Sequence, residues 1–170
     1  MNKHFFFAKK KINQGRTFIV AEISANHNGK LRYLKKIMLA AKKSGADAIK
    51  IQSYEPESIT LKCNNKDFLI KKKTNSNWRK HKNFYNLYKY GQTPIKWHEE
   101  IFKYAKKIKM PIFSSPFEER FVDILEKFNC IAYKIASPEI NHYPLLKKVA
   151  LTGKPIIISS GIAFKKDISN

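Results

Sequence analysis

The chain has 170 residues, 43% of them hydrophobic, which suits one domain with a sizeable core. No apolar run is long enough to cross a membrane, and the run at residues 5–8 is too short for a signal-peptide core. Two cysteines, Cys63 and Cys130, fit a reducing compartment better than a disulfide framework. We therefore expect a cytoplasmic protein.

The formal net charge is +21, from 34 basic and 13 acidic residues. Such an excess is typical of proteins that bind a polyanion, most obviously nucleic acid. However, only four of the basic residues are arginines, and the lysines are spread along the whole chain. Arginine is better suited than lysine to bind phosphates and base edges, because its planar guanidinium can donate two parallel hydrogen bonds. The composition of an AT-rich genome is therefore the favoured explanation, and nucleic acid is not the favoured partner.

Apolar runs and helical periodicities alternate along the chain. Residues 1–16 are expected to form a strand or hairpin extension, and residues 55–92 a long polar excursion. We predict strands at 16–24, 46–54, 109–115, 130–137 and 154–161, and helices at 30–44, 84–88, 95–108, 117–128 and 143–153. After residue 161 only the opening of another helix remains.

Strands that recur with a helix between them indicate an α/β fold with a parallel sheet. A doubly wound open sheet and a (β/α)₈ TIM barrel are the two candidates. No G-x-G-x-x-G loop follows the first strand, and each of the five strands ends in polar residues, which favours the barrel. A complete barrel takes about 250 residues. We therefore expect residues 17–170 to be a partial barrel with about five of eight strands.

Two lysines interrupt apolar strands, Lys50 in "DAIKIQSY" and Lys134 in "CIAYKIAS". A buried ammonium needs an anion nearby or loses its proton. Each lysine could pair with a core carboxylate or extend its side chain to the surface. Alternatively, one forms a Schiff base with a carbonyl substrate, or both bind a small dianion together with the hydroxyls of Ser115, Ser137 and Ser159. The serine-rich strand ends favour a ligand that carries phosphate and carboxylate.

Three further residues lie near the predicted strand ends. Glu22 ends the first strand and Glu139 follows the fourth, although exposed turn positions are the commoner place for glutamate. His27 in "NHNG" is either a metal ligand or a turn residue, and a single histidine is weak support for a metal site.

Five segments, "AEISANHNG", "GADAIKIQSYEPESITL", "FSSPF", "YKIAS" and "KPIIISSGI", together resemble the N-terminal half of the sialic-acid synthase family. The resemblance covers about residues 17–164 in order. These enzymes condense phosphoenolpyruvate with an N-acetylated amino sugar to make nine-carbon (nonulosonic) acids. "KIQSYEP", "SITL", "TPIKWH" and "FSSPF" look more like the pseudaminic acid synthases than the N-acetylneuraminate synthases. Legionaminate synthases are a further alternative.

The resemblance implies roles for residues of this chain. Lys50 and Lys134 match lysines that bind phosphoenolpyruvate, and Ser115, Ser137 and Ser159 match hydroxyls that bind its phosphate. Gln52 and Glu22 fall where the family contacts substrate, and Glu139 matches an acidic residue beside the reacting carbons. Glu22 and Glu139 are accordingly the catalytic candidates.

The resemblance also implies parts that this chain does not supply. The family uses a divalent metal, Mn²⁺ or Mg²⁺, to polarise the sugar aldehyde, and its histidine ligands belong to later barrel strands. None of His4, His27, His81, His98 and His142 falls at such a position. The C-terminal antifreeze-like domain, which caps the partner's site in the family homodimer, is also absent. We expect the chain to be inactive by itself, and its dimerisation is doubtful.

Two interpretations outside catalysis remain open. The chain could be a basic module that binds nucleic acid, or a non-functional remnant of a split gene whose unpaired sheet edges aggregate.

Overall fold

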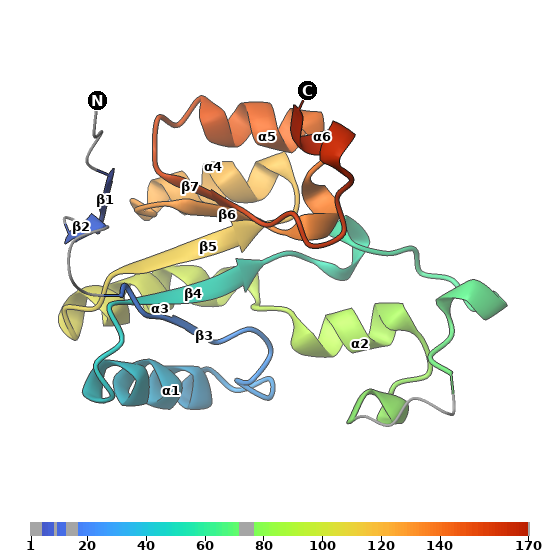
Figure 1. Cartoon of the computed structure of the whole chain (residues 1–170). Helices are drawn as coiled ribbons and strands as arrows, with labels where there is room; N and C mark the ends of the chain where they lie inside the picture. The colour runs from blue at the N-terminus through green and yellow to red at the C-terminus, as the bar shows by residue number, and fades with distance from the viewer. Residues whose placement is uncertain (1–4, 9, 13–16, 72–76, 170) are drawn as a thin grey trace.

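The computed structural model describes residues 5–8, 10–12, 17–71 and 77–169 (Figure 1). One sheet contains five parallel strands in the order β3-β4-β5-β6-β7, so that each strand pairs with its neighbours in the sequence. A doubly wound sheet would reverse its strand order at a switch point. The sheet instead curls into half of a barrel, which confirms the predicted fold class. The strands are β3 (Val20–Glu22), β4 (Ala48–Ser53), β5 (Ile112–Pro116), β6 (Tyr133–Ile135) and β7 (Ile156–Ile158).

Helices connect the strands in the predicted order. They are α1 (Leu31–Lys43), α2 (Phe84–Gly91), α3 (Ile95–Lys107), α4 (Glu119–Lys127), α5 (Tyr143–Ala150) and α6 (Lys165–Ser169). Helix α1 packs beside α3, and α4 packs beside α5 (Figure 1). Gly45 has a φ of +82°, the left-handed conformation that commonly ends a helix such as α1.

The core lies between the sheet and these helices. Ile49 and Ile51 of β4 are fully buried there, together with Leu34 and Met38 of α1. Lys50 lies between the two isoleucines and projects to the opposite, inner face of the half-barrel, where it is only partly buried. The alternation read from the sequence therefore holds for β4.

The amino ends of the strands are covered by a hairpin. Strands β1 (Phe5–Phe7) and β2 (Lys10–Ile12) pair antiparallel within the segment expected to form a strand or hairpin. The ring of Phe7 is buried and makes edge-to-face contacts with Phe18 and Phe113, with centroid separations of 5.2 and 5.1 Å. Because Phe113 lies opposite Lys50 in the sheet register, the hairpin closes this end of the inner face.

The polar excursion after β4 contains the predicted helix, α2. It also contains three short 3₁₀ helices that the sequence did not predict, at Pro56–Ser58, Lys66–Phe68 and Asn77–Lys80. Gly91, at the end of α2, is buried against the loop that follows β3. A Cβ atom there would lie 3.0 Å from the Tyr54 hydroxyl and 3.2 Å from the Ala25 Cβ. Close backbone packing therefore holds α2 beside the carboxyl ends of the strands.

Apolar side chains are exposed where the sheet ends at β7. Ile158 is 54% exposed, and the segment after the strand exposes Ile162, Phe164 and Ile168. An exposed sheet edge beside apolar side chains is typical of a surface that packs against more polypeptide. Within the described ranges, no helix combines the length and the hydrophobicity needed to cross a membrane.

Leu125 in α4 should be essential for stability, because it is fully buried between α4 and the sheet. Leu125→Ala should lower the free energy of unfolding by about 2–5 kcal/mol, measured by urea denaturation. Leu151→Ala is the matched control, since Leu151 is 76% exposed and its replacement should change stability by less than about 0.5 kcal/mol. Equal losses in both variants would contradict the core described above.

Candidate functional site

The predicted site residues gather on the inner face of the half-barrel, near the carboxyl ends of the strands. The sheet register places Glu22 of β3 opposite Lys50 of β4, and Gln52 opposite Ser115 of β5. Lys134 lies on β6. Parallel strands end at the same edge of a sheet, so side chains that are distant in sequence meet there.

Lys50 is held by two neighbours. Its ammonium forms an ion pair with the Glu22 carboxylate and donates a hydrogen bond to the Ser115 hydroxyl, at 3.3 Å. The Lys50 side chain is 13% exposed, whereas that of Glu22 is 41% exposed. Lys50 therefore forms an ion pair, as one interpretation of the sequence expected. Its partner, however, is the partly exposed Glu22 at the rim of the site and not a carboxylate of the core.

Lys134 differs from Lys50 because the described residues give its ammonium no ion pair or hydrogen bond. Burial lowers the pKa of Lys134, and the nearby ammonium of Lys50 lowers it further, while Glu139 and Glu22 act in the opposite direction. The influence of Lys50 on the pKa of Lys134 indicates that the two side chains lie near each other on the inner face. Within the described ranges, a protonated Lys134 therefore has no carboxylate at hydrogen-bonding distance.

Glu139 is the least satisfied acidic group near this site. It ends the 3₁₀ helix Ser137–Glu139, and its Oε2 atom is buried with no hydrogen-bond partner among the residues that the structure describes. Burial raises the pKa of Glu139, opposed in part by Lys134 and His142. Burial raises the pKa of Tyr88 in α2, and the Glu139 carboxylate raises it further. Glu139 also acts on Lys134, so its carboxyl lies near both the lysine site and α2.

The remaining predicted residues have different surroundings. The Ser137 hydroxyl accepts a hydrogen bond from the Ile162 N–H at 2.8 Å, which joins the 3₁₀ helix Ser137–Glu139 to the segment after β7. Ser159 directly follows β7, and in the described structure no hydrogen bond links its hydroxyl to either lysine. Gln52 accepts a hydrogen bond from the Ser24 hydroxyl at 3.0 Å. Sequence reasoning missed Ser24, although it lies two residues beyond Glu22.

The described residues do not fit a metal centre. Among them, no three His, Cys, Asp or Glu side chains lie close enough to hold an ion together. The His27 ring is buried, packs edge-to-face on Trp97 and accepts a hydrogen bond from the Gly29 N–H at 3.1 Å, so the turn-residue interpretation accounts for its position. His4 lies outside the described residues.

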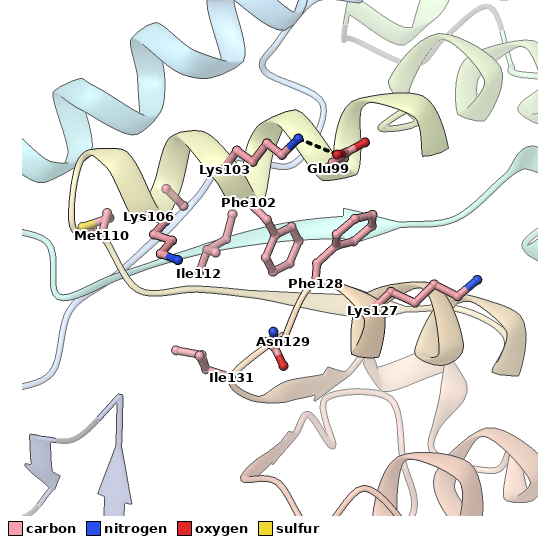
Figure 2. Close-up of a pocket in the computed structure, with 11 residues that line it drawn as sticks. Glu99, Phe102, Lys103, Lys106, Met110, Ile112, Lys127, Phe128, Asn129 and Ile131 are labelled. Carbon is pink, nitrogen blue, oxygen red and sulfur yellow. Dashed lines mark hydrogen bonds and ion pairs between the residues drawn. The ribbon is translucent and has the colours of Figure 1, made fainter.

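A separate groove lies on the outer surface between α3 and α4 (Figure 2). Its volume is about 580 Å³, and its wall includes the stacked rings of Phe102 and Phe128, whose centroids are 5.7 Å apart. None of the predicted site residues lines it. Two cations, hydroxyl donors and unpaired polar groups occur together at the inner face instead, an arrangement suited to a small, multiply charged anion.

Comparisons with known proteins agree in placing this chain. The sequence profile of the NeuB family matches residues 37–170. A pseudaminic acid synthase from Helicobacter pylori is 45% identical over 152 residues, and an N,N'-diacetyllegionaminic acid synthase from Campylobacter jejuni is 34% identical over 149 residues. These matches cover 89% and 87% of this chain but only 44% and 43% of the relatives.

A solved structure has the same architecture. The crystal structure of N-acetylneuraminic acid synthetase from Leptospira borgpetersenii, in complex with citrate, superposes with a TM-score of 0.81 at 26% identity. The superposition covers 98% of this chain and 53% of that protein. The chain thus spans about half the length of the relatives that it matches.

Proposed function

Because the chain belongs to the NeuB family, we propose that it is the N-terminal part of a nonulosonic acid synthase that uses phosphoenolpyruvate and an N-acetylated amino sugar. The observation that carries this proposal is the pair Lys50 and Lys134, two ammonium groups on one inner face. The second forms no ion pair or hydrogen bond with the described residues, although Glu139 and Glu22 act on it electrostatically. Phosphoenolpyruvate has about three negative charges at neutral pH, and its phosphate and carboxylate would supply that partner.

In the proposed complex, the two lysines and Ser115 bind and orient the anion. Lys134 contributes its unpaired charge, while Lys50 exchanges part of its contact with Glu22 for the ligand. Ser137 and Ser159 donate their hydroxyls to the phosphate, and Gln52 contacts the substrate from β4. Charge-assisted hydrogen bonds of this kind contribute about 1.5–3 kcal/mol each.

The proposed reaction forms a bond between C3 of phosphoenolpyruvate and the aldehyde carbon of the open-chain sugar. Positive charge then develops at C2, water adds there, and phosphate leaves by cleavage of its C–O bond. The lysines and hydroxyls accelerate these steps by positioning and by electrostatics. A carboxyl with a raised pKa is suited to proton transfer, so Glu139 is proposed to accept the proton of the attacking water, and Glu22 to hold Lys50 in place.

Pseudaminic acid is the proposed product class. The chain is 45% identical to the pseudaminic acid synthase but only 34% identical to the legionaminic acid relative. Residues 17–170 would then be the N-terminal portion of the synthase barrel, preceded by the extension 1–16. The remaining strands would pack on the exposed apolar side of β7, where Ile158, Ile162 and Phe164 lie.

A condensation assay tests this proposal. The chain alone should release no phosphate from phosphoenolpyruvate in the presence of N-acetylated amino sugars. Addition of the part of the H. pylori relative that lies beyond the matched segment should give sugar-dependent phosphate release. Product from the chain alone would contradict the need for further strands. A complemented mixture that remains inactive with every amino sugar, although both parts are folded, would refute the proposed function.

The alternative of nucleic-acid binding has one specific observation in its favour. Lys30, Arg32 and Lys36 surround the ring of Tyr33 on α1, at 5.4, 5.0 and 6.0 Å from its centroid. The double variant Lys50→Ala/Lys134→Ala separates the two functions. It should abolish complemented synthase activity, whereas salt-dependent binding to DNA through α1 would persist.

A further inference from the structure

A chain of buried polar groups lies between the sheet and α3, directly behind the lysine site. His98 of α3, Ser53 of β4 and Ser114 of β5 are each 0% exposed. The His98 Nε2 atom lies 2.8 Å from the Ser53 hydroxyl, which lies 2.7 Å from the Ser114 hydroxyl. The Ser114 oxygen also lies 3.2 Å from the Ile51 carbonyl oxygen, so its single proton is shared between that acceptor and the Ser53 oxygen. The three side chains thus connect one helix to two strands.

The surroundings of His98 fix the direction of these hydrogen bonds. Its Nδ1 atom lies 3.2 Å from the carbonyl oxygens of Pro94 and Ile95, and both of these groups can only accept. The proton of the neutral ring is therefore on Nδ1, and Nε2 accepts from the Ser53 hydroxyl. Burial lowers the pKa of His98, which keeps the ring neutral at physiological pH. All three residues have a hydrogen-bond partner, so the network is satisfied.

The network touches the two strands next to two proposed ligand contacts. Ser53 directly follows Gln52, and Ser114 directly precedes Ser115, while Gln52 and Ser115 lie opposite each other in the sheet register. Successive side chains of a strand point to opposite faces. The network therefore holds the backbone from the helix side at the point where Gln52 and Ser115 project to the inner face.

We propose that His98, Ser53 and Ser114 are positioning residues, which hold the carboxyl ends of β4 and β5 in register so that Gln52 and Ser115 present their polar groups to the anion. This inference rests on the proposed function for the identity of the anion. Apolar side chains would fill the same space, but their contacts are not directional, whereas hydrogen bonds fix both distance and angle. A displacement of about 1 Å in such a site can reduce a rate by about 100-fold.

Hydrogen exchange of single amides tests the positioning without a ligand. The Phe117 N–H donates to the Ser53 carbonyl oxygen at 3.3 Å, at the carboxyl ends of the two strands, and the Ile49 N–H donates to the Pro111 carbonyl oxygen at 2.9 Å, at their amino ends. Ser53→Ala should accelerate exchange of the Phe117 amide by about tenfold and leave the Ile49 amide unchanged. Ser114→Ala should have the same effect, which guards against a folding defect in one variant.

Ile101→Val is the matched control, because Ile101 is buried in the same helix as His98 but its aliphatic side chain cannot hydrogen-bond to the network. It should accelerate both amides equally or neither. If Ser53→Ala and Ser114→Ala leave the Phe117 amide as protected as in the wild type, the positioning inference is overturned.

Calorimetric titration with phosphoenolpyruvate connects the network to the site. Ser53→Ala should weaken binding by about fivefold to tenfold. In a Gln52→Ala/Ser115→Ala background the same substitution should have no further effect, because the groups that the network positions are then missing. The inference would be overturned if Ser53→Ala bound phosphoenolpyruvate as tightly as the wild type. It would also be overturned if Ser53→Ala weakened binding equally in the wild-type and Gln52→Ala/Ser115→Ala backgrounds. A wild-type chain that fails to bind phosphoenolpyruvate would overturn the proposed function, while the exchange measurement would still decide whether the network holds the strand ends.

Discussion

Lys134→Met should raise the thermal stability of the ligand-free chain and, in the same protein, weaken phosphoenolpyruvate binding by about 10- to 100-fold. The loss of affinity follows from the removal of one charge-assisted contact of about 1.5–3 kcal/mol. The gain in stability follows from the environment of Lys134, where burial and the Lys50 ammonium lower its pKa. Differential scanning calorimetry and titration calorimetry on the same sample measure the two effects.

The stability gain has a defined pH dependence. Because the pKa of Lys134 in the folded chain lies below its ordinary value of 10.5, the unfolded chain binds this proton more tightly. The wild type therefore gains stability as the pH rises through the folded pKa toward 10.5. The advantage of Lys134→Met should be present at pH 7 and should shrink at alkaline pH.

Lys148→Met provides the control, because Lys148 forms a partly exposed ion pair with Asp123 at 2.6 Å. Its loss should lower stability slightly, by about 0–1 kcal/mol, and should leave phosphoenolpyruvate affinity unchanged. The lysine site as described would be wrong if Lys134→Met destabilised the chain and bound the ligand as the wild type does.

Glu139→Gln should stabilise the chain at pH 7 and abolish most of the activity of the complemented enzyme. The pKa of Glu139 is raised by burial, so the ionised form is disfavoured in the folded state. The stability that the protonated carboxyl contributes is complete below the unfolded pKa of about 4.5 and is lost as the pH rises through the folded pKa. The variant should therefore exceed the wild type in stability at pH 7 and match it near pH 4.

Activity gives the second readout for Glu139. Removal of a group that transfers a proton typically reduces the rate by about 10²- to 10⁴-fold, measured as phosphate release in the complementation assay. Glu99→Gln is the matched control with the opposite sign, since its hydrogen bond to Lys103 lowers the pKa of Glu99. That exposed substitution should slightly destabilise at pH 7 and leave the rate unchanged. Stability curves of Glu139→Gln and wild type that coincide at every pH would argue against an unpaired buried carboxyl.

The sequence predicted the fold because strands and helices differ in period. Lys50 could be assigned to the inner face from its position between Ile49 and Ile51, and the same pattern placed Lys134. Each predicted strand began earlier and was longer than the observed one, as in β6, where pairing with β7 is confined to Tyr133–Ile135. A run of apolar residues indicates a strand but does not show where its neighbour stops pairing.

Contacts between strands could not be predicted in the same way. The pairing of Lys50 with Glu22 depends on the register of β3 against β4, which local patterns do not specify. Ser24 has a φ of +46°, and this turn, which brings its hydroxyl to Gln52, has no signature in the residue type. For His98, the sequence provided only an argument against a metal role. Its hydrogen-bond partners could not be predicted, because one of them, Ser53, is 45 residues away in the sequence.

The first 3₁₀ helix of the excursion, Pro56–Ser58, was missed because long-range contacts hold it. Arg120 of α4 donates to the Glu55 carboxylate at 2.6 Å, and the Ser58 hydroxyl donates to Glu118 at 2.8 Å. These contacts join the start of the excursion to the start of α4 across about 60 residues of sequence. A short 3₁₀ turn has little stability of its own, so its sequence carries only a weak signal.

The sequential strand order of the sheet has a consequence for biosynthesis. Because β4 pairs with β3, and β5 with β4, each strand of this sheet after β3 has one neighbour that the ribosome has already translated. Each newly emerged strand and helix can add to a template that is already assembled, and the chain separation of such contacts stays short. Within the described sheet, β7 pairs only with β6, so its other edge presents backbone groups with which a further strand could pair.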